Sequence, residues 1–159
     1  MEEKGFEVSF ASDAITFLER QHRVIERLFM NIESFNRYQA KQKFTVFQEL
    51  AAAISQHSKL EESVFYPALG FDLDLDRRAD FESHHLIAKL IFTIQTGGEN
   101  HQFFHTNIII LKEILQRHFV QEETKNFPWV RSNCSPDHLV KLGDRLKSEA
   151  YKYAANNLH

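Results

Sequence analysis

The sequence predicts an all-α protein, folded as an up-down-up-down four-helix bundle with an additional C-terminal helix. Apolar residues recur at alternating intervals of three and four positions over five long stretches, which is the spacing of one helix face. Glycine or proline follows most of these stretches, and none shows a convincing strand pattern. In a chain of 159 residues we expect a single domain, with the bundle over residues 12–130 and the last helix over residues 136–156.

The first helix is expected over residues 12–37, with Ser12 or Asp13 as the N-cap. Its inward-facing residues are Ile15, Leu18, His22, Ile25, Phe29 and Ile32. This spacing is typical of a helix that lines a bundle core, and it places His22 in that core.

The second helix is expected over residues 43–65. Its inward-facing residues are Phe47, Leu50, Ile54, His57, Glu61 and Val64, so an imidazole and a carboxylate are both predicted in the core. We expect Pro67 to end this helix, because proline lacks the backbone N–H and disfavours helical backbone in the preceding residue. Residues 70–76, Gly-Phe-Asp-Leu-Asp-Leu-Asp, are expected to form a loop.

The third helix is expected over residues 78–96, with Phe81, His84, Ala88, Ile91 and Gln95 on its inward face. Gly97 and Gly98 should end it, since glycine readily adopts the left-handed conformation of a helix C-terminus.

The fourth helix is expected over residues 100–125 and should be closed by Pro128. Its inward-facing residues are Phe104, Ile108, Leu111, Leu115, His118 and Glu122. A fifth helix begins with Ser135 as its cap and Pro136 in the first helical position. We expect it to pack across the bundle or at a subunit contact, in a monomer or a homodimer, without chemistry of its own.

The composition excludes several kinds of partner. The formal net charge is -3 and no run of Lys or Arg occurs, so neither a nucleic acid nor an anionic membrane surface is expected. No window reaches the roughly 18 consecutive apolar residues of a membrane span, and the acidic N-terminus does not resemble a signal peptide. The single cysteine, Cys134, cannot form an internal disulfide. We therefore expect a cytoplasmic location and no thiol chemistry.

An internal repeat relates the two halves of the chain. Residues 57–67 and 118–128 both read His, three residues, Glu-Glu, four residues, Pro. The helices before them match at an offset of 62, which pairs His22 with His84 rather than with His85. In an up-down-up-down bundle, residues equally far from the loop between them lie at the same height. The midpoints between successive predicted core residues fall at or near the predicted loops, so we expect six residues to meet at one level: His22, His57, Glu61, His84, His118 and Glu122.

This set of residues predicts a metal centre. Two carboxylates in an apolar core cost several kcal/mol each unless they are paired, hydrogen-bonded or bound to a cation. No Lys or Arg lies on the four inward faces near them. Two divalent cations would balance the charge, and a nitrogen and oxygen donor set without thiolate suits iron or manganese, with zinc as a further alternative. The other histidines are interpreted as surface or tail residues, Glu62 and Glu123 as outer or solvated groups, and Tyr66 as a core packing residue that could donate a hydrogen bond near the site.

The chain resembles the hemerythrin-like, or HHE cation-binding, family. The matching segments are Gln-His-Arg-Val-Ile-Glu, His-Ser-Lys-Leu-Glu-Glu-Ser-Val-Phe-Tyr-Pro, Glu-Ser-His-His-Leu-Ile and His-Phe-Val-Gln-Glu-Glu. The resemblance implies a non-haem pair of iron ions, one on His22 and His57 and the other on His84 and His118. Glu61 and Glu122 would bridge the two ions. Oxygen-carrying members of the family have a further histidine one turn after the third-helix histidine.

Ala88 stands at that position here, which implies an open coordination position or one filled by Glu26 or a neighbouring carboxylate. The function favoured by the resemblance is binding of, or reaction with, oxygen or nitric oxide, for sensing, storage or detoxification. Whether this includes catalysis is left open. Repair of iron–sulfur clusters is an alternative, disfavoured because no cysteine precedes the first helix. An interaction module responsive to iron and oxygen, and a metal-free structural bundle, are further alternatives.

Overall fold

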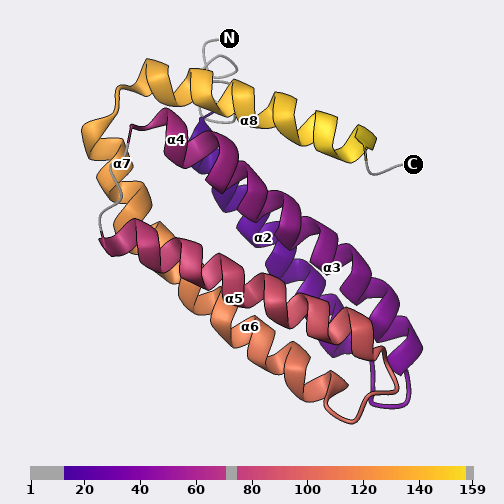
Figure 1. The fold of residues 1–159 in the computed structure, drawn as a ribbon. Coiled ribbons are helices and arrows are strands. Elements are labelled where there is room, and N and C mark those ends of the chain that lie inside the picture. Colours follow the sequence, from indigo (N-terminus) through magenta and orange to yellow (C-terminus); the bar gives the residue numbers. More distant parts are fainter. Residues whose placement is uncertain (1–12, 71–74, 157–159) are drawn as a thin grey trace.

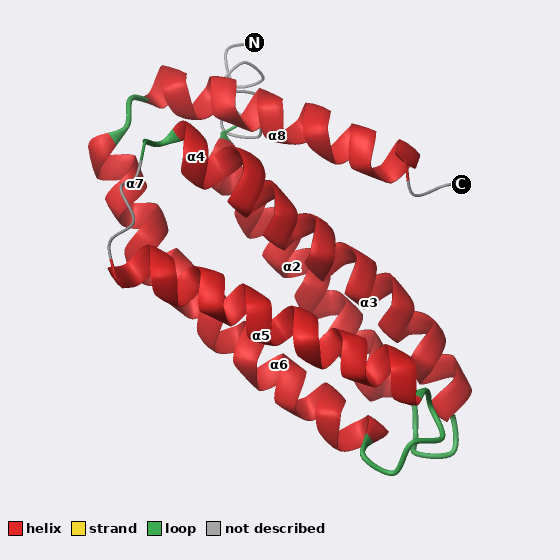
Figure 2. Cartoon of the chain, viewed as in Figure 1, coloured by secondary structure: helices red, strands yellow, loops and turns green. Residues whose placement is uncertain are grey.

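The computed structural model describes residues 13–70 and 75–156, apart from the side chains of residues 75–79. All the elements in these ranges are helical, and no strand occurs among them (Figure 2). Four long helices run alternately up and down, and a fifth lies across one end of the bundle (Figure 1). The predicted fold class is therefore confirmed. None of the described helices combines the length and apolar character that crossing a membrane requires.

The first hairpin consists of α2 (Ala14–Ser34) and α3 (Ala40–Leu60). Asp13 is the N-cap of α2, because its Oδ1 accepts hydrogen bonds from the backbone N–H groups of Ile15 and Thr16 at 2.8 and 3.2 Å. The other predicted cap, Ser12, lies outside the described residues. After α3 the chain continues through a π-helical turn, η1 (Glu61–Phe65), into the short α4 (Tyr66–Ala68).

The second hairpin repeats this order with α5 (Leu75–Gly97), α6 (Phe104–Gln121), a second π-helical turn η2 (Glu122–Asn126) and α7 (Phe127–Asn133). Gly98 has the left-handed φ of 73° that was expected after the helix. The loop predicted over residues 70–76 is wrong at its end, because α5 already begins at Leu75. Residues 71–74 lie outside the described part of the chain.

The π-helical turns explain why proline does not close the two helices as predicted. The backbone N–H groups of Tyr66 and Phe127 bond to the carbonyls of Glu61 and Glu122, five residues back, and the α-helix restarts there. Each proline then lies in the first turn of a new α segment, where its missing N–H is not required. After Pro128 the chain remains helical to Asn133, whereas α4 ends one residue after Pro67.

The last helix, α8 (Pro136–Asn156), packs across the bundle, which was one of the two predicted arrangements (Figure 1). Ser135 caps it as predicted, since its Oγ accepts a hydrogen bond from the His138 N–H at 3.2 Å. The helix contacts α2, α3 and η1, and the Gln56 side chain donates to the Ala150 carbonyl at 3.1 Å.

Two hydrophobic clusters fill the interior and leave a polar layer between them. The larger cluster lies toward the α2–α3 loop and includes Ile25, Phe29, Phe47, Leu50, Ile54, Ile87, Leu111 and Leu115. The smaller lies beneath α8 and includes Ile15, Leu18, Leu60, Phe65, Tyr66, Phe127, Leu139, Leu142 and Leu146. Along α2 and α3 the predicted polar core residues occur where one cluster gives way to the other.

Candidate metal centre

The structure brings the six predicted site residues together in this polar layer. All are buried, with at most 5% of any residue exposed: His22, His57, Glu61, His84, His118 and Glu122. They form two groups of four that share both glutamates, and within each group the ligand atoms lie within 4.8 Å of one another. One group contains His22 and His57, and the other contains His84 and His118.

The imidazoles meet in pairs through the same ring nitrogen. The Nε2 atoms of His22 and His57 lie 3.1 Å apart, and those of His84 and His118 lie 2.9 Å apart. Each pair joins one helix from the start of a hairpin to the helix that follows it, so the pairing follows the internal repeat. The pairs coincide with those that the family resemblance implied for the two ions.

The two carboxylates lie between the imidazole pairs. Glu122 Oε2 is 3.0 Å from His22 Nε2, while its Oε1 is 3.0 Å from His118 Nε2. Glu61 Oε1 is 2.6 Å from His57 Nε2 and 3.7 Å from His84 Nε2. Each glutamate thus faces one imidazole from each half of the chain, which is the position of a bridging ligand.

Several buried polar atoms of the centre have no hydrogen-bond partner. Among the described residues, both oxygens of Glu61, Glu122 Oε2 and His22 Nδ1 are buried without a hydrogen-bond partner, although Glu61 lies close to His57. Buried carboxylate oxygens left in this way are costly, and lone pairs that converge on one point fit a cation better than they fit one another. The residues present therefore fit a pair of metal ions.

The π-helical turns place the glutamates. In both halves the glutamate that follows the core histidine by four residues is the first residue of a π-helical turn. Such turns insert one extra residue and are frequent at functional sites. The next acid in each turn, Glu62 or Glu123, then faces the outer side of an imidazole from the opposite half.

Acceptor groups lie on the Nδ1 side of three of the imidazoles, and two of them are within hydrogen-bond distance. Glu62 accepts from His84 Nδ1 at 3.0 Å, and Glu123 lies 3.6 Å from His22 Nδ1, so their interpretation as outer groups is confirmed. Gln21 Oε1 lies 2.9 Å from His57 Nδ1, a role that the sequence analysis did not anticipate. A proton held on Nδ1 by such an acceptor leaves the Nε2 lone pair free for a metal.

Asp80 is a second residue that sequence reasoning missed. Only 4% of it is exposed, and its Oδ1 lies 3.9 Å from His118 Nδ1. Its Oδ2 accepts from the Tyr66 hydroxyl at 3.1 Å and from the Asn126 side chain at 2.6 Å. Tyr66 packs in the smaller hydrophobic cluster as predicted, and its hydroxyl also lies 3.5 Å from Glu122 Oε1. Asp80 lies one helical turn before His84, and this spacing could have indicated that it faces the centre.

The interpretation of Ala88 as the residue facing an open coordination position was wrong. Ala88 is exposed, as is Gln95, because the inward face of α5 continues from His84 through Ile87, Ile91 and Ile94. The predicted face through Ala88 and the observed face through Ile87 both fit helical spacing. Packing against the larger hydrophobic cluster selects the face through Ile87. Glu26 is also absent from the centre, since it is half-buried on α2 and pairs with Arg23 at 3.0 Å.

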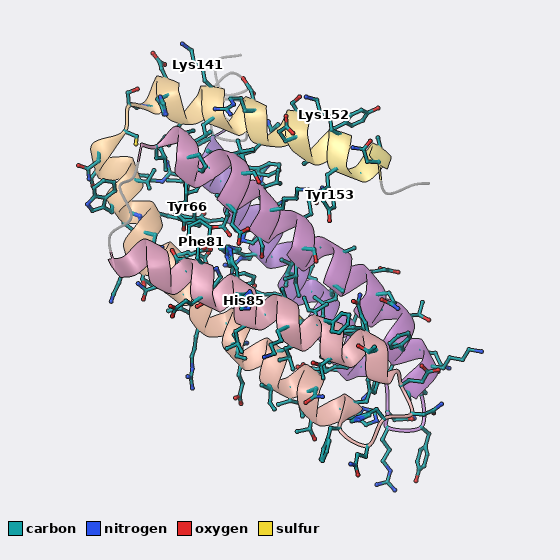
Figure 3. All side chains as sticks on the ribbon, viewed as in Figure 1. Tyr66, Phe81, His85, Lys141, Lys152 and Tyr153 are labelled. Atoms are coloured by element: carbon teal, nitrogen blue, oxygen red, sulfur yellow. The ribbon has the colours of Figure 1, made fainter. Side chains whose placement is uncertain are left out.

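The remaining described histidines lie away from the centre, as predicted. His85, His101 and His138 are exposed, and Figure 3 shows His85 on the outside of α5. His105 is half-buried, with its Nδ1 3.5 Å from Lys43 Nζ. His159 lies outside the described residues. Cys134 is half-buried against the smaller cluster, and burial raises the pKa of its thiol, which agrees with a structural role.

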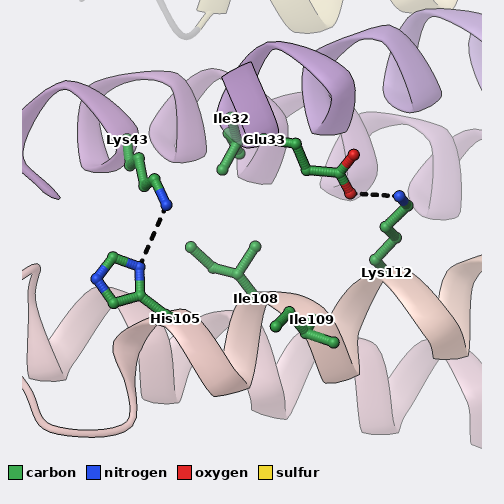
Figure 4. Close-up of a pocket in the computed structure, with 7 residues that line it drawn as sticks. All are labelled: Ile32, Glu33, Lys43, His105, Ile108, Ile109 and Lys112. Carbon is green, nitrogen blue, oxygen red and sulfur yellow. Dashed lines mark hydrogen bonds and ion pairs between the residues drawn. The ribbon is translucent and has the colours of Figure 1, made fainter. Parts of the chain in front are cut away.

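Two cavities lie along the face between α2 and α6. The nearer, of about 340 Å³, is lined by Phe119, whose ring stacks on His22 at a centroid distance of 3.8 Å. The farther, of about 210 Å³, is spanned by the Lys43–His105 and Glu33–Lys112 contacts (Figure 4). The nearer cavity approaches the centre from this face, and the Phe119 ring lies between this cavity and His22.

The buried charges shift one another's pKa. Burial on its own lowers the pKa of His57, but Glu61 and Glu122 more than offset this and raise it to about 10. Burial is likewise outweighed at His118, where Glu122 above all raises the pKa to about 8. Burial and the neighbouring Glu122 raise the pKa of Glu61, whereas His118 and His22 overcome burial and hold the pKa of Glu122 well below its usual value. Without metal, His57 and His118 hold protons that an incoming cation would displace.

Metal-free protein is therefore expected to lose stability as the pH rises above 6.5. A folded-state imidazole pKa above 6.5 contributes stability that is complete below pH 6.5 and is lost as the pH passes about 8 for His118 and about 10 for His57. Asp80, whose pKa burial and Glu122 raise to about 6, changes charge mainly below this window. The His118 shift alone corresponds to about 2 kcal/mol, or a fall in Tm of roughly 4–8 °C.

Calorimetry of chelator-treated and metal-loaded protein between pH 6.5 and pH 9 measures this effect. The metal-loaded form should change less over the same range, because a bound cation keeps the imidazoles unprotonated. Equal slopes for the two forms would contradict the proposed competition between protons and metal.

An all-α bundle whose core holds four imidazoles and two carboxylates around a common point defines a metal-binding helical protein. Residues 13–130 match the sequence model of one protein family, the hemerythrin HHE cation binding domain. The match covers all four bundle helices and every residue of the candidate centre, and the chain belongs to this family.

Two similar proteins illustrate the relationship. An uncharacterized hemerythrin-like protein of Schizosaccharomyces pombe is 26% identical over 150 residues, covering 90% of this chain and 71% of that protein. The crystal structure of a hemerythrin HHE cation binding domain-containing protein from Mycobacterium kansasii superposes with a TM-score of 0.80 over 92% of this chain and 90% of that chain. Its sequence is 19% identical, so this likeness concerns the fold.

Proposed function

We propose that this chain is a non-haem di-iron protein that binds or reacts with oxygen or nitric oxide. The observation that carries the proposal is the pair of buried glutamates, each between one imidazole from each half of the chain. Three of their four oxygens have no hydrogen-bond partner. The proposed ligands are His22 and His57 for one ion and His84 and His118 for the other, with Glu61 and Glu122 bridging.

Iron fits this donor set better than the alternatives do for the proposed role. Imidazole and carboxylate ligands without thiolate also accept manganese and zinc, but binding of oxygen or nitric oxide requires a metal such as iron. A ferrous pair supplies electrons or an open coordination position to a small diatomic ligand. The protein contributes the rest: Glu62, Glu123 and Gln21 orient the imidazoles, and the rings of Phe119 and Phe127 keep water from His22.

The metal part of the proposal is tested with two neighbouring histidines. His84 is buried in the centre and His85 is exposed on the same helix. After purification and anaerobic ferrous loading, His84→Ala should hold fewer than two metal ions per chain, whereas His85→Ala should match the unaltered protein. Metal analysis per chain, with manganese and zinc loaded in parallel, measures this. Equal metal content in the two variants would refute the proposed ligand set.

The ligand part is tested on the ferrous-loaded protein by absorption spectroscopy. Oxygen is added, removed and added again, and a separate sample receives nitric oxide. A spectrum that reverses on removal of oxygen supports binding for storage or sensing, and irreversible oxidation supports a reactive centre. Protein that holds two ferrous ions and responds to neither gas would refute this part of the proposal.

A further inference from the structure

The two halves of the centre differ at three matched positions. The internal repeat pairs Tyr66 with Phe127 and Asn126 with Phe65 at an offset of 61, and Asp80 with Leu18 at an offset of 62. On the His84–His118 side of the centre these positions form a polar triad, defined here as Tyr66, Asp80 and Asn126. On the His22–His57 side the matched positions are two phenylalanines and a leucine. The three apolar residues are at most 1% exposed and belong to the smaller hydrophobic cluster.

The polar triad is internally hydrogen-bonded. The Tyr66 hydroxyl donates to Asp80 Oδ2 at 3.1 Å, and the Asn126 amide donates to the same oxygen at 2.6 Å and to the Tyr66 oxygen at 3.4 Å. Tyr66 and Asp80 are 5% and 4% exposed. Polar groups at this depth cost stability relative to apolar ones, and the matched residues of the other half show that the fold can be completed without them. Departures of this kind are expected at functional positions.

The triad lies close to the His84–His118 pair. The Tyr66 hydroxyl lies 3.5 Å from Glu122 Oε1, and that oxygen is 3.0 Å from His118 Nε2. Asp80 approaches the same imidazole from its Nδ1 side. Tyr66 lies toward the end of the bundle that carries α7 and α8 (Figure 3).

The other imidazole pair is enclosed by aromatic rings. His22 stacks on Phe119 at a centroid distance of 3.8 Å and on Phe127 at 5.8 Å, and Phe119 also packs edge-on against His57. Phe127 occupies the position that the repeat matches to Tyr66, and its side chain carries no hydroxyl. The Tyr66 hydroxyl is therefore a hydrogen-bond donor beside the His84–His118 pair, at a position where the repeat has Phe127 beside the other pair.

We propose that the small ligand binds at the His84–His118 ion and that Tyr66 is its positioning residue, donating a hydrogen bond from its hydroxyl. Asp80 and Asn126 hold the hydroxyl close to the centre, and the ligand becomes an alternative acceptor to Asp80. The His22–His57 ion is then the structural member of the pair. This inference rests on the function proposed above, and it adds which half of the centre takes the ligand and which residue contacts it.

The experiment compares Tyr66→Phe with Tyr38→Phe, a change of the same kind at a residue that is 81% exposed. Each ferrous-loaded protein is given nitric oxide, and the N–O stretching frequency is recorded in H₂O and D₂O. The unaltered protein and Tyr38→Phe should show a solvent isotope shift, which should vanish in Tyr66→Phe. Nitric oxide should also dissociate about tenfold faster from Tyr66→Phe, as expected for one lost hydrogen bond.

If Tyr66→Phe does not hold metal, Asn126→Leu provides the test instead. It keeps Tyr66 but removes one of its supports, so the isotope shift should be reduced. If Tyr66→Phe binds two metals and its isotope shift and dissociation rate are unchanged, the proposed role of Tyr66 is overturned. The function proposed above would still stand. Absence of metal or of nitric oxide binding in the unaltered protein would overturn the proposed function itself, and the inference with it.

Discussion

Replacing Glu61 with alanine is expected to remove at least one of two bound metal ions and to lower the Tm of the metal-loaded protein by about 5–10 °C. Glu61 is fully buried, and both its oxygens lack a hydrogen-bond partner. Its Oε1 faces His57 in one group and His84 in the other, so its loss weakens both proposed positions. Losing an ion present at 100 times its Kd removes about 2.7 kcal/mol, which corresponds to this change in Tm.

The control for this experiment is Glu49→Ala, because Glu49 is an exposed glutamate on α3. Metal content per chain and calorimetry should match the unaltered protein for this variant. Glu61→Gln adds a second comparison, since it keeps the side-chain volume and removes the buried charge. In chelator, Glu61→Gln should be at least as stable as the unaltered protein, because Glu122 and burial disfavour the Glu61 carboxylate. A Glu61→Ala protein with two ions and an unchanged Tm would show that Glu61 is not a bridge.

The core residues of the centre could be predicted because two regularities of the sequence agree. Helical spacing places His22, His57 and Glu61 on inward faces, and the repeat relates them to the second half at nearly constant offsets. Equal distance from the loops then sets their height in the bundle. Each regularity alone is common on protein surfaces, but together they specify a single layer, which the structure shows.

The details around the centre depend on tertiary packing that the sequence pattern does not contain. On α5, the residues three and four positions after His84 both fit a helical stripe, and only packing against neighbouring helices selects Ile87 over Ala88. Asp80 follows an Asp-rich stretch that suggested a loop, and the rotation of α5 turns it inward. The π-helical turns add one residue where α-helical spacing was assumed, which altered the predicted roles of Pro67 and Pro128.

The layered interior gives the metal a structural role as well as a chemical one. The centre lies between the larger hydrophobic cluster and the smaller one beneath α8, and each of the four bundle helices contributes a buried imidazole to this layer. Each π-helical turn begins at one of the glutamates, and π-helical hydrogen bonding is less favourable than α-helical hydrogen bonding. Ions in this layer would hold the turns and join the helices.

Removal of the metal is therefore expected to have the largest effect on stability, lowering the Tm by roughly 10–20 °C at neutral pH. Two ions that bind the folded chain alone contribute through mass action, at about 3–4 kcal/mol each for concentrations of 100 to 1,000 times Kd. Part of this loss is recovered because His57 and His118, whose pKa the neighbouring glutamates raise, take up protons in the metal-free centre. The protein should consequently remain folded after chelation.

Calorimetry before chelation, after chelation and after ferrous ions are added back measures this change. Hydrogen exchange in the same three samples locates it, since η1, η2 and the neighbouring turns of α8 should lose protection before the larger cluster does. Restoration of the original Tm by ferrous ions, but not by Mg²⁺, is the expected result, because imidazole donors suit iron and not magnesium. A Tm that chelation leaves unchanged would mean that the buried glutamates are stabilised by the imidazoles alone, and the four helices would then need no ion to hold this layer together.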